Sequence, residues 1–189
     1  MKKWIGKRTS FIDEKQKVTI VIHPENSALI TALMGGWVAM WFVIGATVTW
    51  SYFTLLLTEQ EEIILFVFMF FWLYYAIRVT RSFFWLLWGK ELIKIDEASF
   101  YYKKSIRGYG KSMPYYLDNI SNLRVHIPKN RSLQATWEQS PWVKGGERLE
   151  FDYMGKVIKF GRKLNESDAE LLFKFIAKKL NQRIRKLTH

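Results

Sequence analysis

Hydrophobic residues occur along this chain in two clearly different patterns, and the first is continuous. Between Asn26 and Thr58 no side chain is charged, and a second apolar run begins at Ile63. A helix rises ~1.5 Å per residue, so runs of this length suit a hydrocarbon core of about 30 Å. The pattern predicts two membrane-spanning helices, over about 27–57 and 62–88, and the short turn between them makes the pair an antiparallel hairpin.

After Gly89 the apolar positions follow a period of two, which is typical of strands that bury one face. Tight turns separate the segments, so we predict a curved antiparallel sheet or barrel of about six or seven strands. The strands expected after Gly89 cover 91–96, 99–103, 113–117, 119–127, 148–153 and 156–160.

A polar leader, residues 1–26, precedes the first apolar helix and contains one strand-like segment. Residues 17–22 are rich in β-branched side chains and are followed by His23 and Pro24. A strand next to a membrane helix must pair elsewhere in the chain. We therefore expect it to join the sheet formed within residues 89–189, which makes the β domain discontinuous around the hairpin.

The chain is predicted to end in an amphipathic helix over 166–186. Asn165 is a suitable N-cap, and apolar residues recur at helical spacing between lysines and arginines. Basic residues near the C-terminal end also complement the helix dipole. We expect this helix to cover one open end of the curved sheet.

The charges indicate how the hairpin is oriented in a membrane. The chain carries a formal net charge of +12, with six Lys/Arg against three acids in residues 1–27 and twenty against ten in residues 92–189. The turn at 58–62 has three acids and no cation. Because positive residues favour the cytoplasmic side, we predict a two-pass integral membrane protein with both termini in the cytoplasm.

Three segments carry a resemblance to a known family: 85–96, 116–124 and 149–153, together with Gly161 and the final helix. The arrangement resembles bacterial membrane proteins that join a two-helix hairpin to a pleckstrin-homology-like (PH-like) domain. This resemblance implies a mainly β, PH-like fold and a place in the bacterial inner membrane. Its motifs are structural and specify no chemistry.

Basic and tryptophan residues near the predicted membrane surface are the candidates for binding lipid headgroups. Juxtamembrane Lys and Arg are attracted to anionic headgroups by about 1 kcal/mol each, and Trp favours the interface. The candidates are Arg78, Arg81, Trp85, Trp88, Lys90, Lys103, Lys104, Arg107 and Lys111. A topology signal and an ordinary solvated surface would explain the same residues.

Two further features are candidates for protein contacts. A long polar loop between Pro128 and Gly146 contains Trp137 and Trp142, which we assign to a protein partner. Small residues let helices approach closely in lipid, and the first apolar helix has a stripe of them. This stripe, Ala28, Ala32, Gly35, Gly36 and Ala39, either receives the aromatic residues of the second helix or docks a helix of another protein.

Nothing in the sequence favours catalysis, and no cofactor is expected. The chain has no cysteine, and its three histidines lie far apart, so we expect no metal site. No nucleophile and base pair, phosphate loop, nucleic-acid motif or small-molecule site is recognisable. The leading hypothesis is a non-enzymatic adaptor or assembly scaffold on the cytoplasmic face, bound to another membrane protein or to itself. The alternatives are a module that responds to anionic lipid and an accessory subunit of a membrane enzyme or transport complex.

Overall fold

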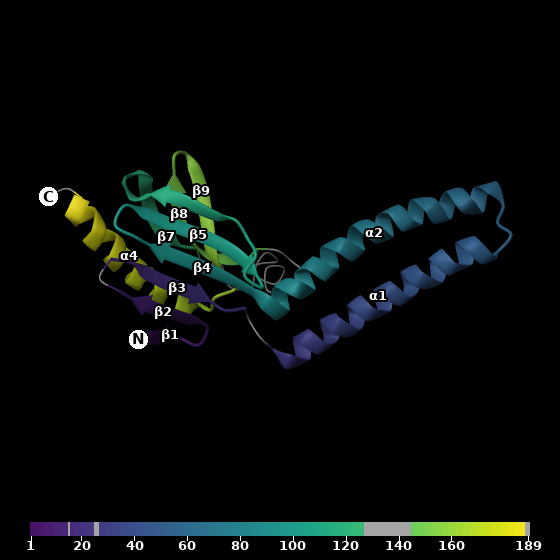
Figure 1. Cartoon of the computed structure of the whole chain (residues 1–189), viewed down its shortest axis with the longest axis horizontal. Helices are drawn as coiled ribbons and strands as arrows, with labels where there is room; N and C mark the ends of the chain where they lie inside the picture. The colour runs from purple at the N-terminus through teal and green to yellow at the C-terminus, as the bar shows by residue number, and fades with distance from the viewer. Residues whose placement is uncertain (15, 25–26, 127–144, 188–189) are drawn as a thin grey trace. The chain divides into compact units, whose positions relative to one another are not determined.

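The computed structural model describes residues 1–14, 16–24, 27–126 and 145–187, and the chain folds as two compact units (Figure 1). The β-unit comprises Met1–Glu25 together with Trp88–His189, and the helical unit comprises Asn26–Leu87. Residues that are separated by the whole helical unit in sequence therefore fold together in the β-unit.

The helical unit consists of α1, Ala28–Thr54, and α2, Glu59–Trp88. Both helices are long and apolar enough to cross a membrane, with 27 and 30 residues. At ~1.5 Å per residue these lengths correspond to about 40 and 45 Å, more than a hydrocarbon core of about 30 Å.

The second helix begins three residues earlier than the apolar run predicts. Thr58 caps it: its backbone N–H donates to Glu61 Oε2 at 2.8 Å, and its hydroxyl oxygen accepts from the Glu61 N–H at 3.4 Å. This reciprocal pair is a capping box, and the acids of the first turn also complement the helix dipole. The polar residues placed in the turn by hydropathy thus form the first turn of α2.

Two tryptophans hold α1 and α2 together. The Trp72 indole N–H donates to the Trp41 carbonyl at 3.0 Å, and the Trp41 indole N–H donates to the Trp72 carbonyl at 3.4 Å. The Trp72 ring lies directly on Gly45, where a Cβ would overlap it. Polar groups in hydrocarbon need partners within the protein. Each indole N–H finds its acceptor in a backbone carbonyl of the other helix.

The small-residue stripe of α1 lies mostly outside this contact. Gly35 faces α2, because a Cβ added there would lie 3.4 Å from the Phe83 ring. The other four members, Ala28, Ala32, Gly36 and Ala39, are exposed. The close approach between the helices is therefore at Gly45, which the stripe did not include, and docking of a second protein on the exposed members stays a prediction.

Nine strands form two antiparallel sheets in the described part of the β-unit. The first sheet has the order β1-β2-β3-β4-β5-β6, with β1 Lys2–Ile5, β2 Thr9–Asp13, β3 Val18–Ile22, β4 Gly89–Ile95, β5 Ser99–Ile106 and β6 Ser112–Tyr116. After a 3-10 turn, η1 at Leu117–Asn119, the second sheet has the order β7-β8-β9, with β7 Ile120–Val125, β8 Glu147–Tyr153 and β9 Lys156–Arg162. The sheets do not form a closed barrel.

The leader contributes three strands rather than one. The predicted segment is β3, which pairs with β4 so that Val18 lies opposite Ile95 and Ile22 opposite Glu91. Val18 and Ile20 are fully buried. The strands β1 and β2 have no clear apolar alternation, and they extend the sheet because β3 leaves an edge whose backbone groups need partners.

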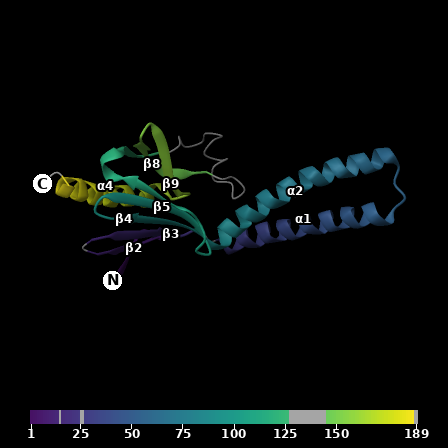
Figure 2. The ribbon, with the colours of Figure 1, turned by 45° about the horizontal axis from the view of Figure 1, so that its top comes forward.

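The core lies between the two sheets and α4, Glu166–Leu187. Phe100 from the first sheet meets Phe151 and Phe160 from the second, with ring centroids 5.2 and 5.8 Å apart. Leu172 and Ile176 of α4 complete this cluster, and the helix runs alongside the strands (Figure 2). Asn165 caps α4 by accepting the Asp168 N–H at 2.7 Å, as its sequence position predicts.

Candidate functional site

Both connections between the β-unit and the apolar helices leave from one end of the first sheet. β3 ends at Ile22, β4 begins at Gly89, and these antiparallel neighbours place Ile22 opposite Glu91. β5 runs back along β4, so that Ile106 lies opposite Gly89. We call this end of the β-unit the junction end; it also contains the turn between β1 and β2, because Thr9 pairs with Ile22.

Cations and exposed aromatic residues gather at the junction end. Trp4 is 55% exposed and stacks on His23, and Tyr109, in the turn after β5, is 85% exposed. Lys7, Lys90, Arg107 and Lys111 are also exposed, and none has a carboxylate within ion-pair distance among the described residues. We call this set the junction rim: Trp4, Lys7, Trp88, Lys90, Arg107, Tyr109 and Lys111.

The opposite end of the β-unit has the reverse character. Five acids lie at its strand ends and connections: Asp13, Glu14, Asp96, Glu97 and Asp118. Three of the cations there form ion pairs with these acids: Lys17 with Glu14, Lys94 with Asp96 and Lys179 with Asp13. These three cations therefore differ from Lys7, Lys90, Arg107 and Lys111 of the junction end, which have no carboxylate partner among the described residues.

The turn between β5 and β6 positions Arg107 tightly. Ile106 and Tyr109 exchange backbone hydrogen bonds of 2.9 and 3.0 Å around Arg107 and Gly108, whose φ values are 51° and 92°. Two positive φ values are the mark of a type I′ hairpin turn, a conformation that costs an ordinary residue about 1–2 kcal/mol. The Arg107 guanidinium carbon lies 4.0 Å from the centre of the Trp88 ring. A cation–π contact at an exposed site stabilises by about 0.5–1 kcal/mol, which offsets part of the cost of the turn.

Two of the predicted lipid-binding lysines are engaged within the β-unit. The Lys103 ammonium donates to the Gly108 carbonyl at 2.7 Å and so braces the same turn. The Lys104 ammonium forms an ion pair with Glu147 at 2.9 Å. Lys104 is consequently a poorer candidate for a headgroup than Lys90, Arg107 or Lys111.

A buried carboxylate joins the two sheets below the rim. Glu91 is 2% exposed, and its carboxylate accepts the backbone N–H groups of Gly161 at 2.7 Å and Arg162 at 3.2 Å. Burial raises the pKa of Glu91, and burial followed by the charge of Glu91 raises the pKa of Tyr102. The strand pattern contained a signal for this residue, because Glu91 shares its face with the buried Ile93 and Ile95.

Neighbouring charges complete this connection. Burial opposes ionisation of Glu147, but the hydrogen bond and charge of Lys104 outweigh it and lower the pKa of Glu147.

Arg8 connects the turn before β2 to the end of β3 by donating to the His23 carbonyl at 2.8 Å. Burial, and then the charges of Lys90, Lys2 and Arg8, lower the pKa of His23. These groups stabilise the junction end, and their hydrogen bonds and ion pairs are directed within the protein.

The remaining predicted residues lie elsewhere. Arg78, Arg81 and Trp85 belong to α2 in the helical unit, where Arg78 donates to the Tyr74 hydroxyl at 3.1 Å. Trp137 and Trp142 lie outside the described residues. Sequence reasoning did not single out Trp4, Lys7 or Tyr109, because only strand pairing brings them to the junction end.

The described residues contain no group of His, Cys, Asp and Glu side chains that could hold a metal ion. Comparisons with models of protein families, with curated proteins and with solved structures find no match for this chain.

Proposed function

We propose that this chain is a non-enzymatic, membrane-anchored adaptor that holds its β-unit against a surface of anionic lipid. The observation that supports this function is the junction rim, which gathers unpaired cations and exposed aromatics where both links to the apolar helices leave. Lys and Arg near an anionic surface are attracted by about 1 kcal/mol each, and Trp and Tyr favour the headgroup region.

On this proposal the two apolar helices cross the bilayer and the rim meets headgroups on the side where both chain ends emerge. The rim cations Lys7, Lys90, Arg107 and Lys111 would together contribute several kcal/mol. This would orient the β-unit, with its acidic turns directed away from the bilayer. The PH-like identity of the β-unit belongs to the same proposal, supported by the antiparallel sheets and the single C-terminal helix.

The test uses the full chain in nanodiscs made of either zwitterionic or anionic lipid. The chain has no cysteine, so Ser112→Cys beside Lys111 gives a single site for a polarity-sensitive fluorophore. In anionic nanodiscs at 0.1 M salt we expect quenching by lipid-attached nitroxides. Quenching should decline at 1 M salt as the Debye length falls from about 10 to about 3 Å.

Charge reversal separates the rim from the general positive charge of the chain. Arg107→Glu with Lys111→Glu should abolish the quenching, because about 2 kcal/mol of attraction is lost and repulsion replaces it. Lys17→Glu with Lys156→Glu makes the same change in net charge at the opposite end and should leave quenching intact. If the fluorophore reports the same environment in both lipids at low salt, the proposal is wrong.

A further inference from the structure

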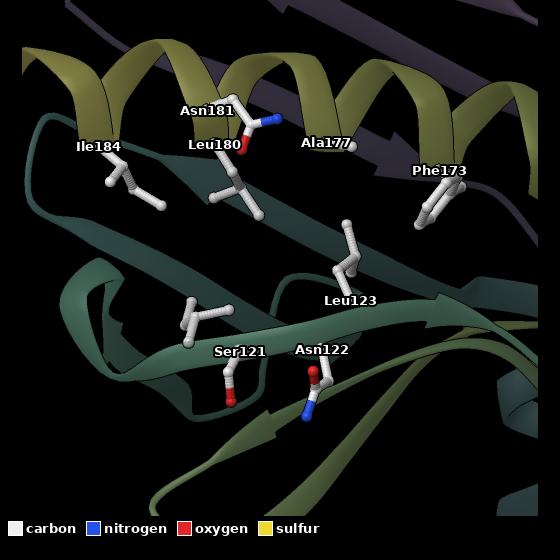
Figure 3. A pocket seen from close by; sticks show the side chains of 9 residues that line it. Ser121, Asn122, Leu123, Phe173, Ala177, Leu180, Asn181 and Ile184 are labelled. Atoms are coloured by element: carbon white, nitrogen blue, oxygen red, sulfur yellow. The ribbon is translucent and has the colours of Figure 1, made fainter.

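A groove of about 250 Å³ lies between strand β7 and helix α4 (Figure 3). Leu123 points toward the helix, and Phe173, Leu180 and Ile184 point toward the strand, so the interior is apolar. Asn122 and Asn181 also line the groove. The groove is smaller than the 300–1,000 Å³ typical of small-molecule sites and is open to solvent, so it suits individual side chains of a peptide.

The backbone of β7 borders this groove. Among the described residues, β7 pairs with β8 alone and is therefore the edge strand of its sheet. Four consecutive residues, Ile120–Leu123, line the groove, although successive side chains of a strand point to opposite faces. The groove therefore borders the backbone of β7 as well as its side chains. An extended peptide there could pair with backbone groups on the side of β7 that has no partner strand in the described part of the chain.

A bulge in β7 limits how much of the affinity for a bound peptide can come from backbone hydrogen bonds. The pairing with β8 shifts between Ser121 and Arg124, and Asn122 has a φ of 52°. A bulge interrupts the regular ladder and protects an edge against indiscriminate strand pairing. Side chains seated in the groove must then supply most of the selectivity.

The charges beside the groove favour an acidic occupant. Lys174 and Lys178 directly follow the groove residues Phe173 and Ala177 in α4, and both are exposed. Neither lysine forms an ion pair in the described part of the chain. A second copy of this chain, with its net charge of +12, is a poor match for these lysines.

We propose that the groove binds an extended, acidic segment of a partner protein, with apolar side chains between β7 and α4 and carboxylates near Lys174 and Lys178. The groove proposal gives the class of partner that the adaptor proposed above would bind, and it rests on that adaptor function. The groove and the junction rim share no residue, so the two proposals can fail separately.

The test is selection of a phage-displayed library of random linear peptides on the full chain in nanodiscs, followed by fluorescence anisotropy with the selected peptides. We expect enriched peptides to combine apolar residues with Asp or Glu. Ala177→Trp fills the groove and should weaken their binding at least about tenfold, whereas Gln182→Trp, on an exposed position outside the groove, should not. Lys174→Glu with Lys178→Glu changes exposed side chains and should also weaken binding about tenfold.

Three results would overturn the proposal: no peptide is enriched, enriched peptides are basic, or binding is equal in wild type and both groove variants. A change in oligomeric state caused by Ala177→Trp would identify a second copy as the occupant instead. The Arg107→Glu with Lys111→Glu variant should bind the peptides like wild type. A wild-type chain whose fluorophore reports the same environment in both lipids, but which still binds the peptides, would therefore reject the rim proposal alone.

Discussion

At the scale of single residues, Glu91 shows how a charged side chain can be required in a core. Its side chain is almost fully buried, and its carboxylate accepts the backbone N–H groups of Gly161 and Arg162, the last two residues of β9. Gly161 has a left-handed backbone conformation, with a φ of 75°. Buried donors without acceptors cost about 1–3 kcal/mol each. Satisfying these two donors therefore offsets part of the free-energy cost of burying the Glu91 carboxylate.

We predict that Glu91→Ala lowers the free energy of unfolding of the β-unit by about 2–4 kcal/mol, because two buried N–H groups lose their acceptor. Glu91→Gln should cost less, since its amide oxygen still accepts one of them. Native-state hydrogen exchange of the core strands in micelles would measure both. Equal stability of Glu91→Ala and wild type would show that water replaces the carboxylate.

The same residue gives a pH dependence of definite sign. Since burial raises the pKa of Glu91 in the folded state, the folded protein retains a proton over a range where the unfolded chain has lost it. This group therefore makes stability fall as pH rises from its ordinary pKa toward the raised one. Glu91→Gln should remove that part of the slope.

At the scale of elements, the leader strand β3 is a central strand of the first sheet rather than a tail. It lies between β2 and β4 and contributes Val18, Ile20 and Ile22 to the core. The sheet therefore cannot be completed until residues on both sides of the helical unit are available. Contacts so distant in sequence slow folding, since a long loop must close first.

Ile20→Ala tests the role of this strand in the full chain. Ile20 is fully buried, so we expect a loss of about 2–4 kcal/mol from the removed methyl groups and the remaining cavity. Ile12→Ala, at a position of β2 that is 38% exposed, is the matched control and should cost much less. If the two substitutions are equivalent in limited proteolysis of the β-unit, β3 does not carry core stability.

At the scale of the whole molecule, the pairing of β3 with β4 constrains how the chain can cross a membrane. These strands flank the helical unit and exchange hydrogen bonds, so both must lie on the same side of any bilayer that α1 and α2 span. From the charges of the flanking segments and the positive-inside rule, we predict that this side is the cytoplasm.

Single cysteines at Glu14, Gln60 and Ser167 would test this topology by labelling in intact cells. All three positions are exposed, whereas Ser10 is buried and would resist reagent from either side. We expect an impermeant maleimide to label Gln60→Cys directly and the other two only after permeabilisation. External labelling of Ser167→Cys would contradict the predicted topology.

The sequence alone determined those features that depend on neighbouring residues. The apolar runs predicted α1 and α2, alternation predicted β3 to β9 to within a few residues at most ends, and the cap at Asn165 with its following pattern predicted α4. These signals are local because hydrophobic length, strand period and capping are each expressed over a few turns or residues.

Tertiary structure alone decided the rest. β1 and β2 form because β3 has an edge with which they can pair. The Trp72 ring lies on Gly45 because packing of α1 against α2 brings these two residues together. The junction rim combines residues from positions 4 to 111, and the groove combines β7 with α4, because pairing register and helix packing bring them together. Register and packing are set by burial of the common core, a property of the folded whole that no local pattern contains.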